Sequence, residues 1–433
     1  MSPRAATGGR LERPRVLLVA PHNSYRIPAY CQAAARLEAD ILVAAGGSAH
    51  ALLPEGVEGL RLDLANPASA LEGLTAAARA RAFAGVVATD DATVELGSRV
   101  ARALSLPHNP PRAARVARRK DLARAALAAA GAPVPGFARL DLEGDVRDQA
   151  RTVSYPCVVK PLALAGSRGV IRADGADELV AACRRVGRIV AHAHDPEERR
   201  YVLAEDFMPG REVALEGMLS AGRLEVLALF DKPDPLDGPY FEETYYVTPS
   251  RLSAPLQAQV EQRAQEACAA YGLREGPVHA ELRVSGNDAR ILEVAARTIG
   301  GDCARLLEFG AGQSLEELVL THALGRALRL QPGAGAAGVL MLPTPKRGTL
   351  RRVEGVIQAR RVRYVDDVVI AVREGYELLP LPEGSSYLGF VFAHAPTAES
   401  VEAALRAAHA CLNVVIAPVW TLEPAAQLDS ALS

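Results

Sequence analysis

Short apolar runs alternate with amphipathic segments through the first hundred residues. The runs at residues 15–21 and 85–89 are almost entirely apolar, as in strands that are covered on both faces. An amphipathic helix is predicted at residues 27–37, and a further strand at residues 40–44. Strands that alternate with helices predict a parallel α/β sheet for roughly residues 14–110. Because no GxGxxG sequence follows the first strand, a dinucleotide-binding Rossmann domain is the weaker interpretation.

A different order of elements follows the prolines at positions 110 and 111. One long helix is predicted for residues 112–131, where the sequence GAPVP stops it. The next predicted elements are a strand at 157–160, a helix at 176–193, and strands at 202–206, 212–219 and 224–230. The last ones are a helix near 315–328, a linker at 331–335 and a small α/β unit with a long helix at 398–411.

Residues 278–293 have the pattern of a β-hairpin. Two apolar runs flank the turn-rich segment of residues 285–288. If the loop comprises residues 286–288, Glu281 lies opposite Glu293, and their Cβ atoms are about 5 Å apart on one face. A two-residue loop would put the two acids on opposite faces, so a shared face requires the longer loop or a bulge.

Two opposed carboxylates would make this face a candidate metal site. Like charges that face each other destabilise a sheet, and a divalent cation commonly neutralises them. Arg297 continues the Glu293 face at a spacing of two, and its guanidinium suits a phosphate or a carboxylate. Taken alone, the segment favours a solvated hairpin with scattered charges over a metal site, and the rest of the chain must decide.

The bulk composition excludes several classes of protein. A chain of 433 residues is too long for one core, so two to four domains are expected. A net charge of -2 leaves no basic field for nucleic acid. The six cysteines form no CxxC pair, which argues against zinc and disulfide frameworks and favours the cytoplasm. No apolar run approaches the about 18 residues of a membrane helix, and residues 1–13 are expected to be a disordered tail.

Lysine is rare in this chain, and one lysine stands beside a glycine-rich loop. The lysines are Lys120, Lys160, Lys232 and Lys346, among 49 basic residues. A lysine retained among so many arginines suggests a site that needs a compact ammonium group. Lys160 ends an apolar strand and precedes LALAGSRG. In that loop the small residues Gly166, Ser167 and Gly169 allow backbone N–H groups to fold over an anion, while Arg168 is expected to face solvent.

The segment from Glu205 to Glu212 offers a candidate nucleotide contact. An extended strand that ends in an exposed acidic and apolar run can present backbone groups to an adenine edge. The side chains of Phe207 and Met208 would cover the ring, and Glu212 could accept hydrogen bonds from ribose hydroxyls. On this segment alone, an edge strand and a turn are favoured.

The order and spacing of these pieces resemble the ATP-grasp superfamily, from Val16 to about residue 395. The pieces that carry the resemblance are Lys120 in RRKDLARAALAAAGAPVPGF, Lys160 with AGSRGV, Glu205 with Glu212, and Glu281 with Glu293 and Arg297. The resemblance implies a Rossmann-like preATP-grasp α/β domain, a two-lobed ATP-grasp domain and a small C-terminal α+β domain. Their implied bounds are residues 14–111, 112–330 (small lobe about 112–203, large lobe about 204–330) and 331–433.

The resemblance also implies roles for individual residues. Lys120 and Lys160 would contact ATP phosphates, and the loop of Gly166, Ser167 and Gly169 would cover them. The segment from Glu205 to Met208 would form the adenine hinge, and Glu212 would bind ribose. Glu281 and Glu293 would hold Mg²⁺, with Mn²⁺ as an alternative. Lys160 and Arg297 would stabilise the transferred phosphoryl group. Many members carry asparagine two residues after the second metal glutamate, where this chain has Ala295.

Within the superfamily, two segments resemble the L-amino acid ligases. These are EVAARTIGGD and the C-terminal SSYLGFVFAHAPTAESVEAAL, and a Glu243-Thr244 pair before the hairpin is a further similarity. A histidine that often follows this pair is replaced here by Tyr245 or Tyr246, which leaves the residue that handles the amine open. The residues expected to face substrates are Glu243, Tyr246, Lys232, His279, Arg297 and Gly301. A solvated lysine at position 232 and a structural histidine at position 279 are the alternatives.

The implied activity is ATP-dependent ligation of a carboxylate to an amine. An acyl phosphate would form from ATP and the carboxylate, and the amine would then give an amide, ADP and phosphate. Expected partners are small carboxylates and amines, without nucleic acid or membrane, and homodimerisation is left open. The alternatives are a carboxylase that uses bicarbonate and a nucleotide-binding protein without turnover.

Overall fold

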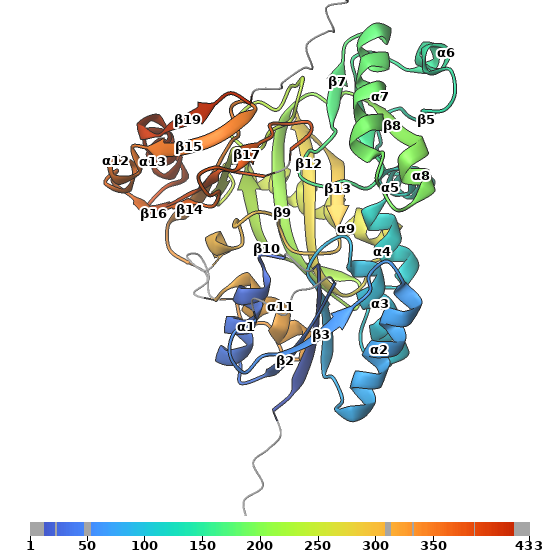
Figure 1. Ribbon diagram of the computed structural model, residues 1–433, viewed down its shortest axis with the longest axis vertical. Helices are drawn as coiled ribbons and strands as arrows, with labels where there is room; N and C mark the ends of the chain where they lie inside the picture. Colours follow the sequence, from blue (N-terminus) through green and yellow to red (C-terminus); the bar gives the residue numbers. More distant parts are fainter. Residues whose placement is uncertain are drawn as a thin grey trace, which may run out of the picture.

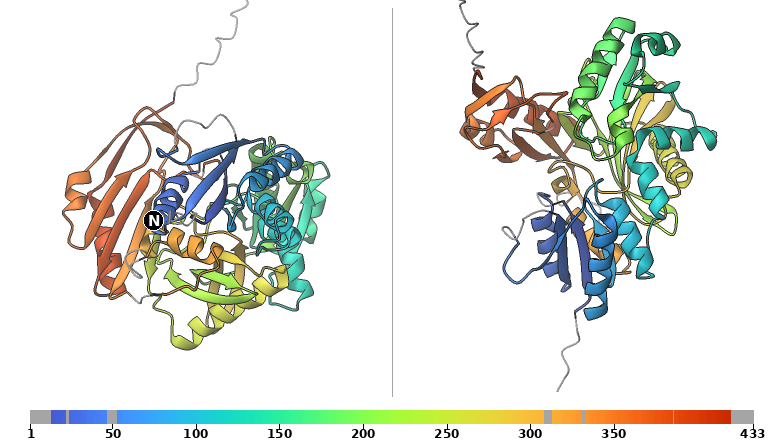
Figure 2. Two further views of the ribbon diagram at one scale, coloured as in Figure 1. Left: turned by 90° about the horizontal axis from the view of Figure 1, so that it is seen from below. Right: turned by 45° about the vertical axis from the view of Figure 1, so that its right-hand side comes forward.

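The computed structural model describes residues 13–21, 24–46, 53–307, 313–330, 333–384 and 386–419. In Figure 1 and in the right-hand view of Figure 2, the N-terminal unit lies at one end of the molecule, and the small lobe and the C-terminal unit lie at the other. The expected tail falls outside the described residues apart from Arg13, and the expected linker at 331–335 falls partly outside them.

The N-terminal unit is the parallel α/β sheet that the sequence predicts. Its strand order is β3-β2-β1-β4, and all its pairings are parallel. The strands are β1 (Arg15–Ala20), β2 (Asp40–Gly46), β3 (Glu58–Leu62) and β4 (Gly85–Ala88), and the helices are α1 (Ile27–Arg36), α2 (Pro67–Ala80) and α3 (Val94–Ala103). Every residue of β1 is buried, which explains its uninterrupted apolar run.

The long helix predicted for residues 112–131 is in fact two helices. Helix α4 (Pro111–Arg118) and helix α5 (Lys120–Ala129) are separated by Arg119, whose backbone is extended. The Arg119 guanidinium is buried against Asp121, at 2.8 and 2.9 Å. The backbone N–H of Lys120 donates to the carbonyl of Leu162 at 2.8 Å. The break therefore places Lys120 at the start of a helix, beside the glycine-rich loop.

The small lobe is an antiparallel sheet with the order β5-β8-β6-β7. Its strands are β5 (Phe137–Asp141), β6 (Cys157–Pro161), β7 (Ile171–Ala173) and β8 (Tyr201–Asp206), and its helices are α6 (Val146–Gln149), the 3-10 helix η1 (Ala150–Thr152), α7 (Ala176–Val190) and α8 (Pro196–Arg200). Because β8 pairs on both sides, the edge strand favoured for the segment around Glu205 is wrong.

One eight-stranded sheet joins the large lobe to the C-terminal unit, in the order β13-β12-β9-β10-β11-β14-β18-β16. Its strands are β9 (Arg211–Ser220), β10 (Arg223–Asp231), β11 (Tyr245–Thr248), β12 (Gly276–Ser285), β13 (Asp288–Ala295), β14 (Ala336–Leu342), β16 (Val365–Ile370) and β18 (Gly389–Ala395). The remaining elements are α9 (Ala254–Tyr271), α11 (Leu315–Ala323), β15 (Gly348–Glu354), α12 (Val356–Arg360), β17 (Glu377–Leu378), α13 (Ala398–Cys411) and β19 (Asn413–Ala417). None of the helices within the described ranges is both long and apolar enough to cross a membrane.

The β12–β13 hairpin reaches its predicted register by a different route. Ser285 pairs with Asp288, so the loop has two residues, and of the two routes to a shared face the three-residue loop is not the one found. A bulge then shifts the ladder, because Leu282 pairs with Ile291 while Glu281 pairs with Glu293. Leu292 is the extra residue. The two acids therefore oppose each other as predicted. With a two-residue loop, it is the bulge that brings them onto the same face.

Candidate active site

An open pocket lies between the small lobe, the hairpin and the C-terminal unit. It encloses about 1210 Å³ of unfilled space, which includes open solvent at its mouth. Its walls include Lys160 from the small lobe, Glu293 from the hairpin and Tyr387 from the C-terminal unit. All the site residues predicted from the sequence line this pocket except Gly169 and Lys232. Segments that are far apart in the sequence thus meet at one place.

Lys160 is paired with a buried carboxylate beneath the pocket. Its Nζ lies 2.5 Å from Glu205, whose other partner is Arg124, at 2.6 and 3.2 Å. Burial opposes ionisation of Glu205, but the charges of Arg124 and Lys160 prevail and lower its pKa to about 2. The Glu205 side chain is therefore part of an internal ion cluster. The nucleotide contact expected of Glu205 would therefore be made by its backbone groups, and it remains a prediction.

Arg124 connects this ion cluster to the hairpin bulge, and the sequence analysis missed it. Its guanidinium also donates to the carbonyl oxygens of Ile291 and Leu292, at 2.8 and 2.9 Å. These are the residues at the register shift, where ladder bonds are lost. An arginine on the apolar side of a predicted helix was the available signal.

The glycine-rich loop has the backbone that its composition predicts. Gly166, Ser167 and Gly169 all have positive φ, at 64°, 53° and 74°. Lys120 supports the loop, because its Nζ donates to the carbonyl of Leu164 at 2.8 Å. The N–H of Gly169 already donates to the carbonyl of Pro382 at 2.9 Å. An anion would therefore be bound by the loop residues that precede Gly169.

A segment of the C-terminal unit is bound to this loop, which the sequence did not reveal. Arg168, expected in solvent, is half-buried and donates to the carbonyl of Glu383 at 2.9 Å. The Glu383 carboxylate accepts two hydrogen bonds from Arg185 on α7, at 2.6 and 2.8 Å. This segment also leads into Tyr387 on the pocket wall. The C-terminal unit therefore binds the loop and holds it beside the pocket.

Replacing Glu383 by alanine should raise the KM for ATP about two- to fivefold, with a smaller change in kcat. The pair with Arg185 is partly exposed, and such pairs contribute up to about 1 kcal/mol. Steady-state ADP formation measures the effect. Glu377→Ala is the matched control, because Glu377 pairs with Arg347 within the C-terminal unit. Equal KM values for the two variants would show that the contact does not hold the loop.

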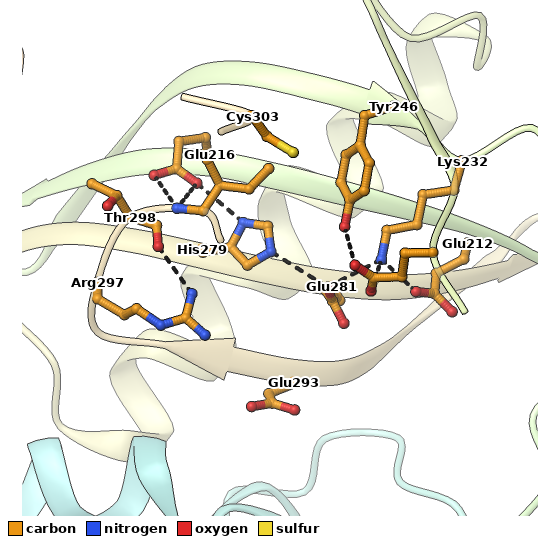
Figure 3. A network of polar contacts seen from close by, with 12 residues as sticks. Glu212, Glu216, Lys232, Tyr246, His279, Glu281, Glu293, Arg297, Thr298 and Cys303 are labelled. Carbon is orange, nitrogen blue, oxygen red and sulfur yellow. Dashed lines mark hydrogen bonds and ion pairs between the residues drawn. The ribbon is translucent and has the colours of Figure 1, made fainter. Parts of the chain in front are cut away.

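The opposed acids of the hairpin have lysine partners in this structure. Glu293 lies 3.1 Å from the Nζ of Lys120. Glu281 lies 3.0 Å from the Nζ of Lys232 (Figure 3). Both carboxylates also line the pocket. Two opposed carboxylates that each hold a cationic group fit a divalent metal ion in chemistry and charge. Ala295 lines the same pocket and adds no ligand atom.

Lys232 is buried among carboxylates, so the solvated alternative for this lysine is wrong. Its Nζ lies 2.6 Å from Glu212 (Figure 3) and 2.7 Å from Glu243. Burial alone would lower the pKa of Lys232, but Glu212, Glu243 and Glu281 raise it well above its usual value. The ribose contact expected of Glu212 remains a prediction, and its carboxylate is also bound to Arg283 at 3.1 Å.

Glu243 and Tyr246 form a hydrogen-bonded pair on the pocket wall. The Tyr246 hydroxyl donates to Glu243 at 2.8 Å. Burial and the neighbouring charge of Glu281 raise the pKa of Glu243 to about 7. Burial likewise raises the pKa of Tyr246, which makes its hydroxyl a donor and a poor base. Their expected role toward a substrate remains a prediction.

His279 bridges two acids. Its Nδ1 lies 3.1 Å from Glu216 and its Nε2 lies 3.4 Å from Glu281. Burial disfavours the charged ring, but these two carboxylates raise the pKa of His279 to about 9. Glu216 also accepts a hydrogen bond from the N–H of Ile299. These contacts fit the alternative of a structural histidine. The ring also lines the pocket, so the substrate contact expected of His279 remains a prediction.

Arg297 is oriented by the N-terminal unit. Its Nε donates to Asp91 at 2.9 Å, and its Nη1 donates to the carbonyl of Thr298 at 2.9 Å. Burial opposes the charge on Asp91, but Arg297 lowers the pKa of that carboxyl below its usual value. The sequence analysis missed Asp91 as a partner. Its place just after β4, at the carboxyl end of a parallel strand, was the available signal.

The pocket includes a partly apolar compartment. It is lined by Gly301, Cys303, Met341 and Tyr387. Gly301 has φ +61°, and a Cβ there would lie 3.3 Å from the sulfur of Met341. A larger residue would therefore narrow this compartment. Burial raises the pKa of Cys303, which leaves its thiol protonated and unreactive.

Successive stretches of the chain match known family profiles. Residues 31–108 match the ATP-grasp N-terminal domain, and residues 153–305 match the ATP-grasp domain. The chain belongs to the ATP-grasp family. Residues 340–417 match the L-amino acid ligase C-terminal domain 2, which groups this ATP-grasp protein with carboxylate–amine ligases. The resemblance predicted from the sequence is confirmed.

Individual relatives agree with this grouping. Alanine–anticapsin ligase of Bacillus subtilis is 26% identical over 224 residues, which are 48% of this chain and 47% of that protein. Carnosine synthase 1 of Homo sapiens is 29% identical over 261 residues, which are 57% of this chain and 31% of that protein. The chain therefore spans about half the length of the first and a third of the second. The crystal structure of an L-amino acid ligase from Bacillus licheniformis superposes with a TM-score of 0.78 at 25% identity, over 94% of this chain and 100% of that one.

Proposed function

We propose that this chain is an ATP-dependent ligase that joins an amino acid or small carboxylic acid to an amino acid. The observation that carries the proposal is the single pocket in which two lysines, two opposed acids and Arg297 face a compartment completed by the C-terminal unit. That unit matches an amino acid ligase domain. The six cysteines are all unpaired, which supports action in the cytoplasm.

The nucleotide would lie between the small lobe and the hairpin. Lys120, Lys160 and the loop at Gly166 and Ser167 would bind the phosphates, while Phe207 and Met208 would cover the adenine. Glu281 and Glu293 would hold Mg²⁺ or Mn²⁺, which neutralises phosphate charge when bound. Lys120 would then transfer its hydrogen bond from Glu293 to a phosphate oxygen.

The chemistry would proceed in two steps. A carboxylate oxygen attacks the γ-phosphorus, the bond to the β,γ-bridging oxygen breaks, and ADP leaves. The amine then attacks the carbonyl carbon of the acyl phosphate, loses a proton, and expels phosphate as the amide forms. Lys160 and Arg297 stabilise the charge that spreads over the phosphoryl oxygens. The closed loop excludes water, which would otherwise hydrolyse the acyl phosphate.

The proposal is tested by phosphate release with Mg-ATP and a matrix of amino acids and carboxylates, alone and in pairs. We expect release that requires a pair, and a product mass equal to both substrates minus water. Release with bicarbonate alone would replace the ligase by a carboxylase. ATP binding without release for any pair would indicate a nucleotide-binding protein without turnover.

The Arg297→Met variant should lower kcat at least about 100-fold, because a charged donor to the transferred phosphoryl group is lost. ADP formation at saturating substrates measures the effect. Arg290→Met is the matched control, since Arg290 lies on the same hairpin, is exposed and pairs only locally with Asp288. Comparable rates for the two variants would remove Arg297 from the proposed mechanism.

A further inference from the structure

Lys232 sits in a cage of acidic side chains beside the proposed metal ligands. Its ammonium group has three N–H donors, and three carboxylate oxygens lie within hydrogen-bond distance, on Glu212 (2.6 Å), Glu243 (2.7 Å) and Glu281 (3.0 Å). The Lys232 side chain is 3% exposed. Donors and acceptors therefore match in number, and no donor is left for a ligand in the pocket.

The same three carboxylates have the spacing of a metal-ligand set. One oxygen from each lies within 4.8 Å of the other two, which is close enough for all three to bind one cation. The ammonium of Lys232 is bound to all three residues. The ring of Tyr246 lies 5.0 Å from the Nζ and adds a cation–π contact. The ammonium group of Lys232 thus occupies a position in which a metal ion would otherwise fit.

Lys120 provides a contrast within the same site. It binds one carboxylate, Glu293, and one carbonyl, and its side chain lines the pocket. Lys120 can therefore give up Glu293 when a nucleotide and a metal ion enter. Lys232 does not line the pocket, and its release would leave one buried and two half-buried carboxylates without the cation that they share.

We infer that Lys232 takes the place of a second metal ion, so that the site binds one divalent ion with its nucleotide. The inference rests on the proposed function for the identity of the first metal site at Glu281 and Glu293. One Glu281 oxygen is held by Lys232 and His279, which leaves the other for the ion. Ala295, on the same pocket wall, supplies no ligand to a second one.

The first test counts metal ions on the unmodified protein. Mn²⁺ is titrated against the chain with a non-hydrolysable ATP analogue, and free Mn²⁺ is followed by electron paramagnetic resonance. We expect one Mn²⁺ per chain at saturation. Two would overturn the inference. The count requires no turnover, so a chain that proves not to be a ligase still gives a decisive result.

The second test removes the ammonium group. Without nucleotide, Lys232→Met should bind one Mn²⁺ ion at the three carboxylates. Its affinity for Mn²⁺ should be at least tenfold higher than that of the wild type, and added Mn²⁺ should raise the Tm of the variant. Lys232→Arg keeps the charge and should gain no ion, and Lys346→Met, at an exposed lysine, is the surface control. The double variant Lys232→Met/Glu243→Gln should lose the added ion. A folded Lys232→Met protein that binds no more Mn²⁺ than the wild type would contradict the inference, and if this variant does not fold, the wild-type count decides.

Discussion

The Glu293→Gln variant should form ADP at least about 1000-fold more slowly than the wild type, because metal and charge stabilisation dominate phosphoryl transfer. Glutamine keeps the shape of the side chain and one oxygen, but it removes the negative charge that opposes Glu281 across the hairpin. The Mg²⁺ concentration needed for half-maximal activity should rise as well. A coupled assay of ADP formation at several Mg²⁺ concentrations measures both effects.

The fold should survive this substitution. Glu293 lines the open pocket, and its charged partner Lys120 has the carbonyl of Leu164 as a second acceptor. The Tm of the variant should therefore be close to that of the wild type. Glu225→Gln is the matched control, because Glu225 is an exposed acid on β10 of the same sheet. Full activity of Glu293→Gln at low Mg²⁺ would remove the metal assignment.

The Arg124→Leu variant should lose about 3–5 kcal/mol of folding stability. Arg124 is 2% exposed and is one of the two cations that neutralise Glu205, which is equally buried. Removal of one partner from a buried ion pair leaves an uncompensated charge, which costs this amount. The variant also leaves the carbonyl oxygens of Ile291 and Leu292 without their donor. Urea unfolding measures the loss, and Arg115→Leu, at an exposed arginine on α4, should change stability little.

The pH dependence of this loss of folding stability distinguishes the contribution of charge from that of packing. The pKa of Glu205 is about 2 in the folded protein, against an ordinary value of 4.5. The ionised Glu205 with its two cations, Arg124 and Lys160, therefore contributes about 3 kcal/mol above pH 4.5, and this contribution falls as the pH falls toward 2. The difference between the wild type and Arg124→Leu should narrow by about 1 kcal/mol between pH 7 and pH 4. A difference that stays constant would assign the loss to packing alone.

The hairpin shows how far the sequence could predict the site. Alternation and the turn residues indicate both strands, and the shared face of Glu281 and Glu293 was derived from them. The bulge that produces this register was not visible. It depends on Arg124, more than 160 positions away, whose guanidinium binds the carbonyl oxygens at Ile291 and Leu292. Local pattern cannot reveal a register shift that a distant helix stabilises.

The lysines likewise show which features the local sequence predicts and which depend on residues far apart in the chain. Their rarity marked Lys120, Lys160 and Lys232 as candidates, and all three lie in or beside the pocket. The helix break before Lys120 was missed, since neither proline nor glycine marks it, and it depends on buried ion pairs of Arg119. The acids of the cage around Lys232 come from two strands, β9 and β12, and a loop that only the folded sheet brings together.

Oxygen transfer from the carboxylate substrate tests the proposed ligase most directly. Once the substrate pair is known, the carboxylate is labelled with ¹⁸O on both oxygens, and the released phosphate is analysed by mass spectrometry. The acyl phosphate mechanism predicts one ¹⁸O in each phosphate and one in the amide. Phosphate that contains no ¹⁸O would show that the carboxylate never attacks the γ-phosphorus, which would contradict the proposed activity.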